Sequence, residues 1–265
     1  MVFPLKEFRL RLADREMDCI TFGRGDRPMV VIQGLSTRGI KGAGLLFALM
    51  YRIFAVDHTV YLFDRRTVLR EGVTVRELAA DVAAAMDALG LTGANVLGVS
   101  QGGMMAQYLA MDRPELVNKL VLAVTLSRNN PTVEGVINRW IDLTRQGRTK
   151  KLVRDMTELL YSEAYRKRYQ LLLPLLTLIQ KPRDPQRFIT LAEACLTCRT
   201  YEVLNRITCP VLVIGGGQDQ VVSGEASVEL ARNLGCQIYM YKDLGHAIYE
   251  ESSDFNRKVV DFFRE

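Results

Sequence analysis

The sequence contains few of the residues that build disulfide scaffolds or metal centres. Its 265 residues include five cysteines, two histidines and one tryptophan. An odd, scattered set of cysteines in a chain of this size argues against a disulfide framework. Cys195 and Cys198 form a lone C-x-x-C pair, so a zinc site is poorly supported and we expect no metal and no cofactor. The pair is either a redox site or, as we favour, two buried thiols near a helix end.

Long apolar runs are also missing. The longest, from Leu171 to Ile179, is far shorter than the ~20 residues of a membrane-spanning helix. The stretch from Met1 to Glu7 reaches charged residues at once and has no apolar signal core. We therefore expect no membrane span, no targeting segment and a cytoplasmic location. A length of 265 residues with 48% hydrophobic and 25% charged residues fits one large globular α/β domain, with room for an insertion.

What is present is an alternation of strand and helix patterns. Continuous apolar runs such as 29–32 and 211–214 are typical of parallel strands that are buried on both faces. Thr74 and Glu77 form a capping box that begins a helix ending near Leu89. From residue 131 to residue 206 the pattern is helical only. There we expect helices at about 132–146, 149–161, 164–180 and 185–196.

This arrangement predicts an α/β fold with a mostly parallel, doubly wound sheet. We expect residues 1–130 and 207–265 to form its core. Residues 131–206 are expected to form a helical lid inserted after the sixth strand.

The sequence Gly98-Val99-Ser100-Gln101-Gly102 lies between a short apolar strand and a helix. This is the G-x-S-x-G context of a nucleophile elbow, a sharp turn that strains the serine backbone and needs neighbours without Cβ atoms. The alternative is that Ser100 only caps the helix, since serine is a favoured capping residue. The strand before it and the helix after it favour a catalytic Ser100.

A serine nucleophile needs a base, and the base needs an acid that orients it. Asp219 and His246 each follow a predicted strand, so they fall at the same sheet edge as Ser100. The alternatives are a polar turn residue and a hydrogen-bonded loop histidine. His58, the other histidine, precedes a strand and so belongs to the opposite edge.

The oxyanion of such a reaction needs preorganised donors. We expect the backbone N–H groups of Gln101 and Leu35 to supply them, with Gly34 allowing close approach; the alternative at Leu35 is a plain turn. We place Gly34 and Trp140 in contact with substrate. Trp140, Ile141, Leu143 and residues 171–179 either wall an apolar acyl pocket or only pack the lid.

The predicted lid carries the excess positive charge. Residues 131–200 hold 13 Lys and Arg against 7 Asp and Glu, a net charge of +6, whereas the whole chain is +5. Residues 148–151 and 166–168 are the densest clusters. We favour solvated helix faces, and attraction of an anionic substrate is the alternative. No motif for nucleic-acid binding accompanies the charge.

Several motifs make the chain similar to the α/β-hydrolase-fold superfamily, in particular to its lidded serine esterases and enol-lactonases. They are residues 33–36, 63–66, 98–103, 204–210, 217–219 and 245–246, and the order Ser100, Asp219, His246 matches as well. Relatives usually carry His-Gly where this chain has Gln33-Gly34, and Asp-x-Arg-Gly where it has residues 64–67.

The resemblance implies hydrolysis of a small-molecule ester, thioester or lactone through an acyl-serine intermediate. Two alternatives keep the same three residues: a C–C bond hydrolase or perhydrolase, and a ligand sensor with slow turnover. The sequence predicts neither the natural substrate nor the oligomeric state.

Overall fold

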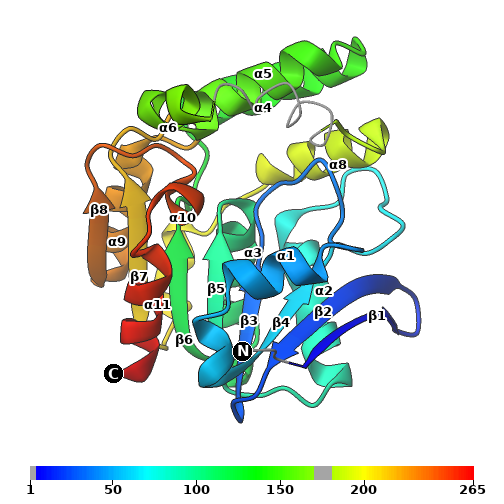
Figure 1. Cartoon of the computed structure of the whole chain (residues 1–265), viewed down its shortest axis with the longest axis vertical. Helices are drawn as coiled ribbons and strands as arrows, with labels where there is room; N and C mark the ends of the chain where they lie inside the picture. Colours follow the sequence, from blue (N-terminus) through cyan, green and yellow to red (C-terminus); the bar gives the residue numbers. More distant parts are fainter. Residues whose placement is uncertain (1–3, 170–180) are drawn as a thin grey trace.

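The computed structural model describes residues 4–169 and 181–265, and its centre is an eight-stranded sheet (Figure 1). The strand order is β1-β2-β4-β3-β5-β6-β7-β8. β1 pairs antiparallel with β2, and β2 with β4, whereas all later neighbours are parallel. The strands are β1 (Leu5–Arg11), β2 (Glu16–Gly23), β3 (Arg27–Ile32), β4 (His58–Phe63), β5 (Ala94–Val99), β6 (Val117–Ala123), β7 (Val211–Gly216) and β8 (Gln237–Tyr241). The predicted mostly parallel sheet is confirmed.

Helices cover both faces of the sheet, as doubly wound folds require. The α-helices are α1 (Gly44–Met50), α2 (Val75–Ala88), α3 (Gln101–Asp112), α4 (Pro131–Arg145), α5 (Thr149–Leu160), α6 (Glu163–Arg168), α8 (Pro185–Cys195), α9 (Gly224–Leu234), α10 (Ile248–Glu251) and α11 (Phe255–Arg264). The described residues also form the short 3₁₀ helices η1 (Phe54–Val56), η2 (Pro114–Leu116) and η3 (Tyr201–Arg206).

The apolar run of β3 shows why this sheet is buried. Val30 and Ile32 pack into one hydrophobic cluster together with α2, α3 and α9, while Met29 and Val31 pack into a second cluster together with α11. Successive strand residues point to opposite faces, so a strand covered on both sides needs apolar residues at every position. At roughly 25 cal/mol per Å² of apolar surface, this double burial is the main stabilising contribution.

Local capping signals are confirmed at α2. The Thr74 side chain accepts the backbone N–H of Glu77, and the Glu77 carboxylate accepts the N–H of Thr74. Gly90, just after the helix, has a φ of 66°. Glycine adopts this left-handed conformation without a Cβ clash, so the helix ends there.

Helices α4, α5, α6 and α8 lie between β6 and β7 in the chain, where the sequence predicted a helical insertion. Figure 1 shows α4, α5 and α6 across the carboxyl ends of the parallel strands. The helix predicted over 164–180 is wrong in its extent, because α6 ends at Arg168 and Tyr169 occupies its C-cap. Residues 170–180 lie outside the described part of the chain. Among residues 4–169 and 181–265, no helix is both long and apolar enough to cross a membrane.

Helix α3 packs unusually close to β3. A Cβ atom at Gly102 would lie 1.9 Å from the carbonyl oxygen of Ile32. Backbone atoms cannot rotate away as a flexible side chain does, so this approach depends on glycine. Gly135, within α4, is exposed and has nothing within 4 Å of its Cβ position.

These two glycines provide a matched test of the close approach. Gly102→Ala should lower the free energy of unfolding by about 3 kcal/mol or more, at or above the usual overpacking cost of about 1–3 kcal/mol. Gly135→Ala should raise it by about 0.5–1 kcal/mol, because alanine is the better helix former. Urea unfolding followed by circular dichroism measures both, and a neutral Gly102→Ala would contradict the packing described here.

Candidate active site

Ser100 occupies the sharp turn between β5 and α3. Its φ of 53° and ψ of −119° lie in a region that non-glycine residues rarely adopt. Although Ser100 stands at the N-cap position, its side chain makes no capping hydrogen bond. Strained backbone of this kind persists where the surrounding structure enforces it, and it clusters at functional sites. The geometry is therefore that of a nucleophile elbow, and capping does not explain the serine.

The Ser100 hydroxyl instead faces His246. Ser100 Oγ lies 2.9 Å from His246 Nε2, and His246 Nδ1 lies 2.8 Å from Asp219 Oδ2. His246 and Asp219 are both buried, with 2% and 6% of their surface exposed. An ionised carboxylate only accepts hydrogen bonds, so the proton belongs on Nδ1 and leaves Nε2 free to accept from the serine. The structure thus brings the three predicted residues together.

Asp219 is held by its own backbone surroundings. Its second carboxylate oxygen accepts the N–H groups of Val221 and Val222 at 2.8 and 3.0 Å. With both oxygens used, the carboxylate is fixed in one orientation toward His246. The other acids near His246 are directed elsewhere: Asp243 is exposed, and Glu251 accepts from the Ser162 backbone and hydroxyl.

A small apolar cavity surrounds Ser100. Its volume is about 50 Å³, and Gly34, Leu35, Trp140 and His246 are among the residues that line it. The indole N–H of Trp140 donates to Asp155, so the ring position is fixed. Gly34, Leu35 and Trp140, which we expected at the site, thus line the space beside Ser100.

For Ile141 and Leu143, the alternative of plain packing describes the structure. Both residues are buried in the hydrophobic core, and neither lines the Ser100 cavity. The remaining predicted segment, 171–179, lies outside the described residues. Met156 and Leu160 of α5 line the cavity instead. The sequence predicted a helix at 149–161 but gave no sign of what its faces would contact.

A second cavity of about 280 Å³ adjoins the first. It shares Gly34, Leu35, Met156, Leu160 and Tyr249 with the cavity at Ser100. Its other lining residues come largely from α1 and the preceding loop. Together the two spaces offer room for a small substrate beside Ser100.

Two backbone segments lie next to Ser100. Gln101 is the first residue of α3, so its N–H has no acceptor within the helix. Gly34 lies against the serine: a Cβ atom there would be 3.2 Å from Ser100 Cβ and 3.7 Å from Ser100 Oγ. The turn after β3 and the start of α3 therefore converge on Ser100, as the sequence predicted.

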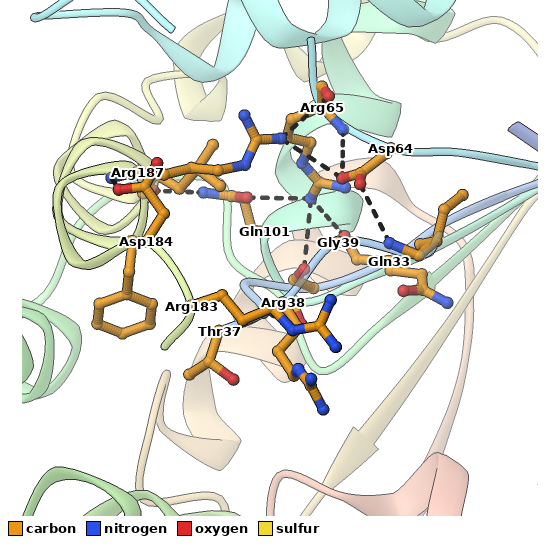
Figure 2. A pocket seen from close by; sticks show the side chains of 15 residues that line it. Gln33, Thr37, Arg38, Gly39, Asp64, Arg65, Gln101, Arg183, Asp184 and Arg187 are labelled. Carbon is orange, nitrogen blue, oxygen red and sulfur yellow. Dashed lines mark hydrogen bonds and ion pairs between the residues drawn. The ribbon is translucent and has the colours of Figure 1, made fainter. Parts of the chain in front are cut away.

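The sequence analysis missed the role of Arg65. This buried guanidinium donates to the carbonyl oxygen of Gln33 at 2.5 Å and to Gln101 Oε1 at 3.0 Å, with a longer contact to the carbonyl of Gly34 (Figure 2). Burial lowers the pKa of Arg65 to about 10, so the side chain stays charged at neutral pH. The cation holds the Gln33–Gly34 turn against α3. Its position after β4 was visible in the sequence, but its three acceptors are brought to it by tertiary packing.

The Gln101 amide extends this connection to α8. Its Nε2 donates to the carbonyl oxygen of Leu191 at 2.6 Å and lies 3.1 Å from the Sγ atom of Cys195. Cys195 and Cys198 are buried free thiols at the end of α8, and burial raises the pKa of each to about 12. Thiols held in the neutral form are poor nucleophiles and metal ligands. Within the described ranges, no group of three or more His, Cys, Asp or Glu is placed to hold a metal.

The predicted basic clusters lie away from Ser100. Arg166, Lys167 and Arg168 form the last turn of α6, where Lys167 pairs with Glu163 at 2.6 Å. None of the three lines the Ser100 cavity. Arg66, another basic residue near the strand ends, pairs with the buried Asp81 of α2.

A model of the α/β hydrolase fold family matches residues 27–253, which is most of the chain. The chain belongs to this family. It is 25% identical over 257 residues to RutD of Rhizobium rhizogenes, a protein named for carbamate hydrolysis, covering 90% of this chain and 95% of RutD. It is 24% identical over 230 residues to 3-oxoadipate enol-lactonase 2 of Acinetobacter baylyi, covering 84% and 82%.

Among solved structures, the enol-lactonase of Burkholderia xenovorans LB400 superposes with a TM-score of 0.86 at 20% identity, covering 97% of this chain and all of that one. An N-acyl homoserine lactone degrading enzyme, Est816, superposes with a TM-score of 0.78 at 24% identity, covering 96% and 100%. At these identities the likeness establishes the fold.

The contribution of Arg65 to the free energy of unfolding can be measured. Arg65→Met removes the hydrogen-bond donor of two or three oxygen atoms. Each buried acceptor that is left unpaired lowers the free energy of unfolding by roughly 1–3 kcal/mol. We expect a loss of about 3 kcal/mol, which lowers Tm by roughly 6–12 °C in a chain of this size.

Arg145→Met is the matched control for this change. Arg145 is 58% exposed and pairs with Glu193 at the surface, where such pairs contribute about 0–1 kcal/mol. Differential scanning calorimetry compares the two variants. Equal shifts in Tm would show that Arg65 contributes no more than a surface cation.

Proposed function

We propose that this protein is a serine hydrolase that cleaves a small carboxylic ester, thioester or lactone through an acyl-serine intermediate. The observation that carries the proposal is the unbroken hydrogen-bonded chain from Ser100 Oγ through His246 to Asp219, buried at the carboxyl ends of the strands. Family membership and the hydrolase names of the relatives support the reaction class.

In the proposed reaction, Ser100 Oγ attacks the substrate carbonyl while His246 Nε2 takes the hydroxyl proton. Asp219 keeps the other ring nitrogen protonated and stabilises the imidazolium that forms. The backbone N–H groups of Gln101 and Leu35 stabilise the oxyanion. His246 then returns the proton to the leaving oxygen or sulfur, and water attacks the acyl-serine by the same route.

We further propose that residues 131–206 act as a lid on this core of residues 1–130 and 207–265. α4 and α5 contribute Trp140, Met156 and Leu160 to the cavity beside Ser100, so the segment forms part of the substrate site. The backbone N–H of Ala247 donates to the carbonyl oxygen of Leu160, which ties α5 to the loop of His246. Movement of the lid would therefore change the position of His246, the proposed base.

Ser100→Ala tests the nucleophile. The variant should lose labelling by a fluorophosphonate probe and should lose turnover by roughly a million-fold, because no other group replaces the attacking oxygen. Ser252→Ala, a serine outside the site, serves as the control and should label normally. A panel of short esters, thioesters, lactones and carbamates supplies the substrates. Labelling that survives in Ser100→Ala would disprove the assignment, and one acylation per chain without turnover would indicate a ligand sensor.

Asp219→Asn tests the orienting acid. The amide presents a donor to His246 Nδ1 and favours the wrong tautomer, so turnover should fall by roughly ten-thousand-fold while the fold is retained. Asp243→Asn removes a nearby exposed carboxylate and should change turnover less than twofold. Steady-state kinetics with one ester, together with circular dichroism, gives the comparison. If turnover of Asp219→Asn fell by less than tenfold, the acid that orients His246 would be another residue.

A further inference from the structure

A third cavity lies on the other side of the turn that follows β3. Its volume is about 60 Å³, and it is bounded by the turn itself, the end of β4, the start of α3 and the N-terminal part of α8 (Figure 2). Gly34 lines both this cavity and the one at Ser100. The Cβ position of Gly34 is 3.7 Å from Ser100 Oγ, so this shared residue lies directly against the serine.

Charge dominates the lining of this third cavity. Four arginines, Arg38, Arg65, Arg183 and Arg187, line it together with two acids, Asp64 and Asp184. No other cavity described above carries such an excess of cations. The lining has a formal net charge of +2, which favours an anion within a partly enclosed space.

Two of the four arginines are committed to internal bonds. Arg65 donates to the turn carbonyls and to Gln101. Arg187 donates to the backbone carbonyl oxygens of Arg65 and Arg66, and it lies 3.6 Å from Asp64.

The two acids are committed as well. Asp64 accepts the backbone N–H groups of Ile40 and Arg65. Asp184 caps α8 by accepting the N–H of Arg187 at 2.9 Å. Neither carboxylate accepts a hydrogen bond from Arg38 or Arg183 in the described part of the chain.

Arg38 and Arg183 are different. Among the described residues, neither guanidinium has a hydrogen-bond acceptor or an acidic partner, and Figure 2 draws no ion pair to either. Arg38 is half-buried in the turn and Arg183 is exposed just before α8. Guanidinium groups present planar forks of donors that match carboxylates. Two of them on one cavity, without a counter-ion, fit a ligand that brings the negative charge.

We propose that Arg38 and Arg183 form an anion subsite that binds the carboxylate of the substrate whose reacting carbonyl lies at Ser100. This inference rests on the proposed function and narrows its substrate class to acidic esters or lactones. The substrate passes over Gly34, with its acyl carbonyl at the serine and its anionic end in the third cavity. The rest of the basic charge in residues 131–206 is not part of this subsite.

A fixed subsite and general electrostatic steering make different demands on the substrate. A subsite requires one separation between carbonyl and carboxylate, so the preference for charge should peak at one chain length. Steering raises the rate at which the substrate meets the protein, and it does not depend on that separation. Salt screens it over about 8 Å at physiological ionic strength. Chain length is therefore the variable that separates them.

The experiment uses p-nitrophenyl half-esters of succinic, glutaric and adipic acid, each paired with the neutral p-nitrophenyl ester of equal carbon number. For the best-fitting length, kcat/KM should favour the acidic ester at least tenfold. Arg38→Gln/Arg183→Gln should remove that preference and leave the neutral esters within twofold. Lys150→Gln/Lys151→Gln removes the same charge from the exposed start of α5 and should keep the preference.

Three results would overturn the subsite: no charge preference in the unchanged protein, equal loss in the lysine control, or a parallel fall for acidic and neutral esters. If no ester is hydrolysed at all, the proposed function fails, and glutarate binding measured by calorimetry still decides the subsite. Binding that weakens at least tenfold in the arginine double variant supports it. Absence of glutarate binding to the unchanged protein rejects it.

Discussion

The strained backbone at Ser100 is the constraint on which the rest of this site depends. A φ of 53° at a serine persists only because β5, α3 and β3 are packed too closely for the turn to relax. Gly102 allows α3 to approach β3, and Gly34 allows the turn after β3 to lie against the Ser100 side chain. The result is a hydroxyl held out of the helix, within 2.9 Å of His246, rather than turned inward to cap α3.

The buried cation Arg65 shows how the surrounding structure maintains this geometry. A charge removed from water is stable only when its hydrogen bonds are satisfied. Arg65 meets that condition with acceptors from the turn after β3 and from Gln101, and Gln101 in turn reaches α8. One side chain therefore links the two turns that face Ser100 and connects both to the helical segment above them.

The substrate side of the site is divided by chemical character. The spaces beside Ser100 and toward α1 are lined largely by apolar and aromatic side chains, whereas the space beyond Gly34 is lined by arginines. Under the proposed function, such a division would suit substrates with an apolar portion and an acidic end. The relatives carry names for both carbamate and lactone cleavage, so reaction class within the family does not follow from the core alone.

The sequence by itself determined the alternation of strands and helices, the elbow at Ser100 and the strand ends that carry Asp219 and His246. Those features depend on local patterns: apolar runs, capping residues and glycines at fixed spacing. Tertiary structure alone decided that Arg65 holds the turn, that Ile141 and Leu143 pack in the core, and that α5 lines the cavity. It also placed Arg38 beside Arg183, which are 145 positions apart in the chain. Contacts between distant segments leave no periodic pattern in the sequence. Each such contact depends on residues of both segments, so neither segment predicts it alone.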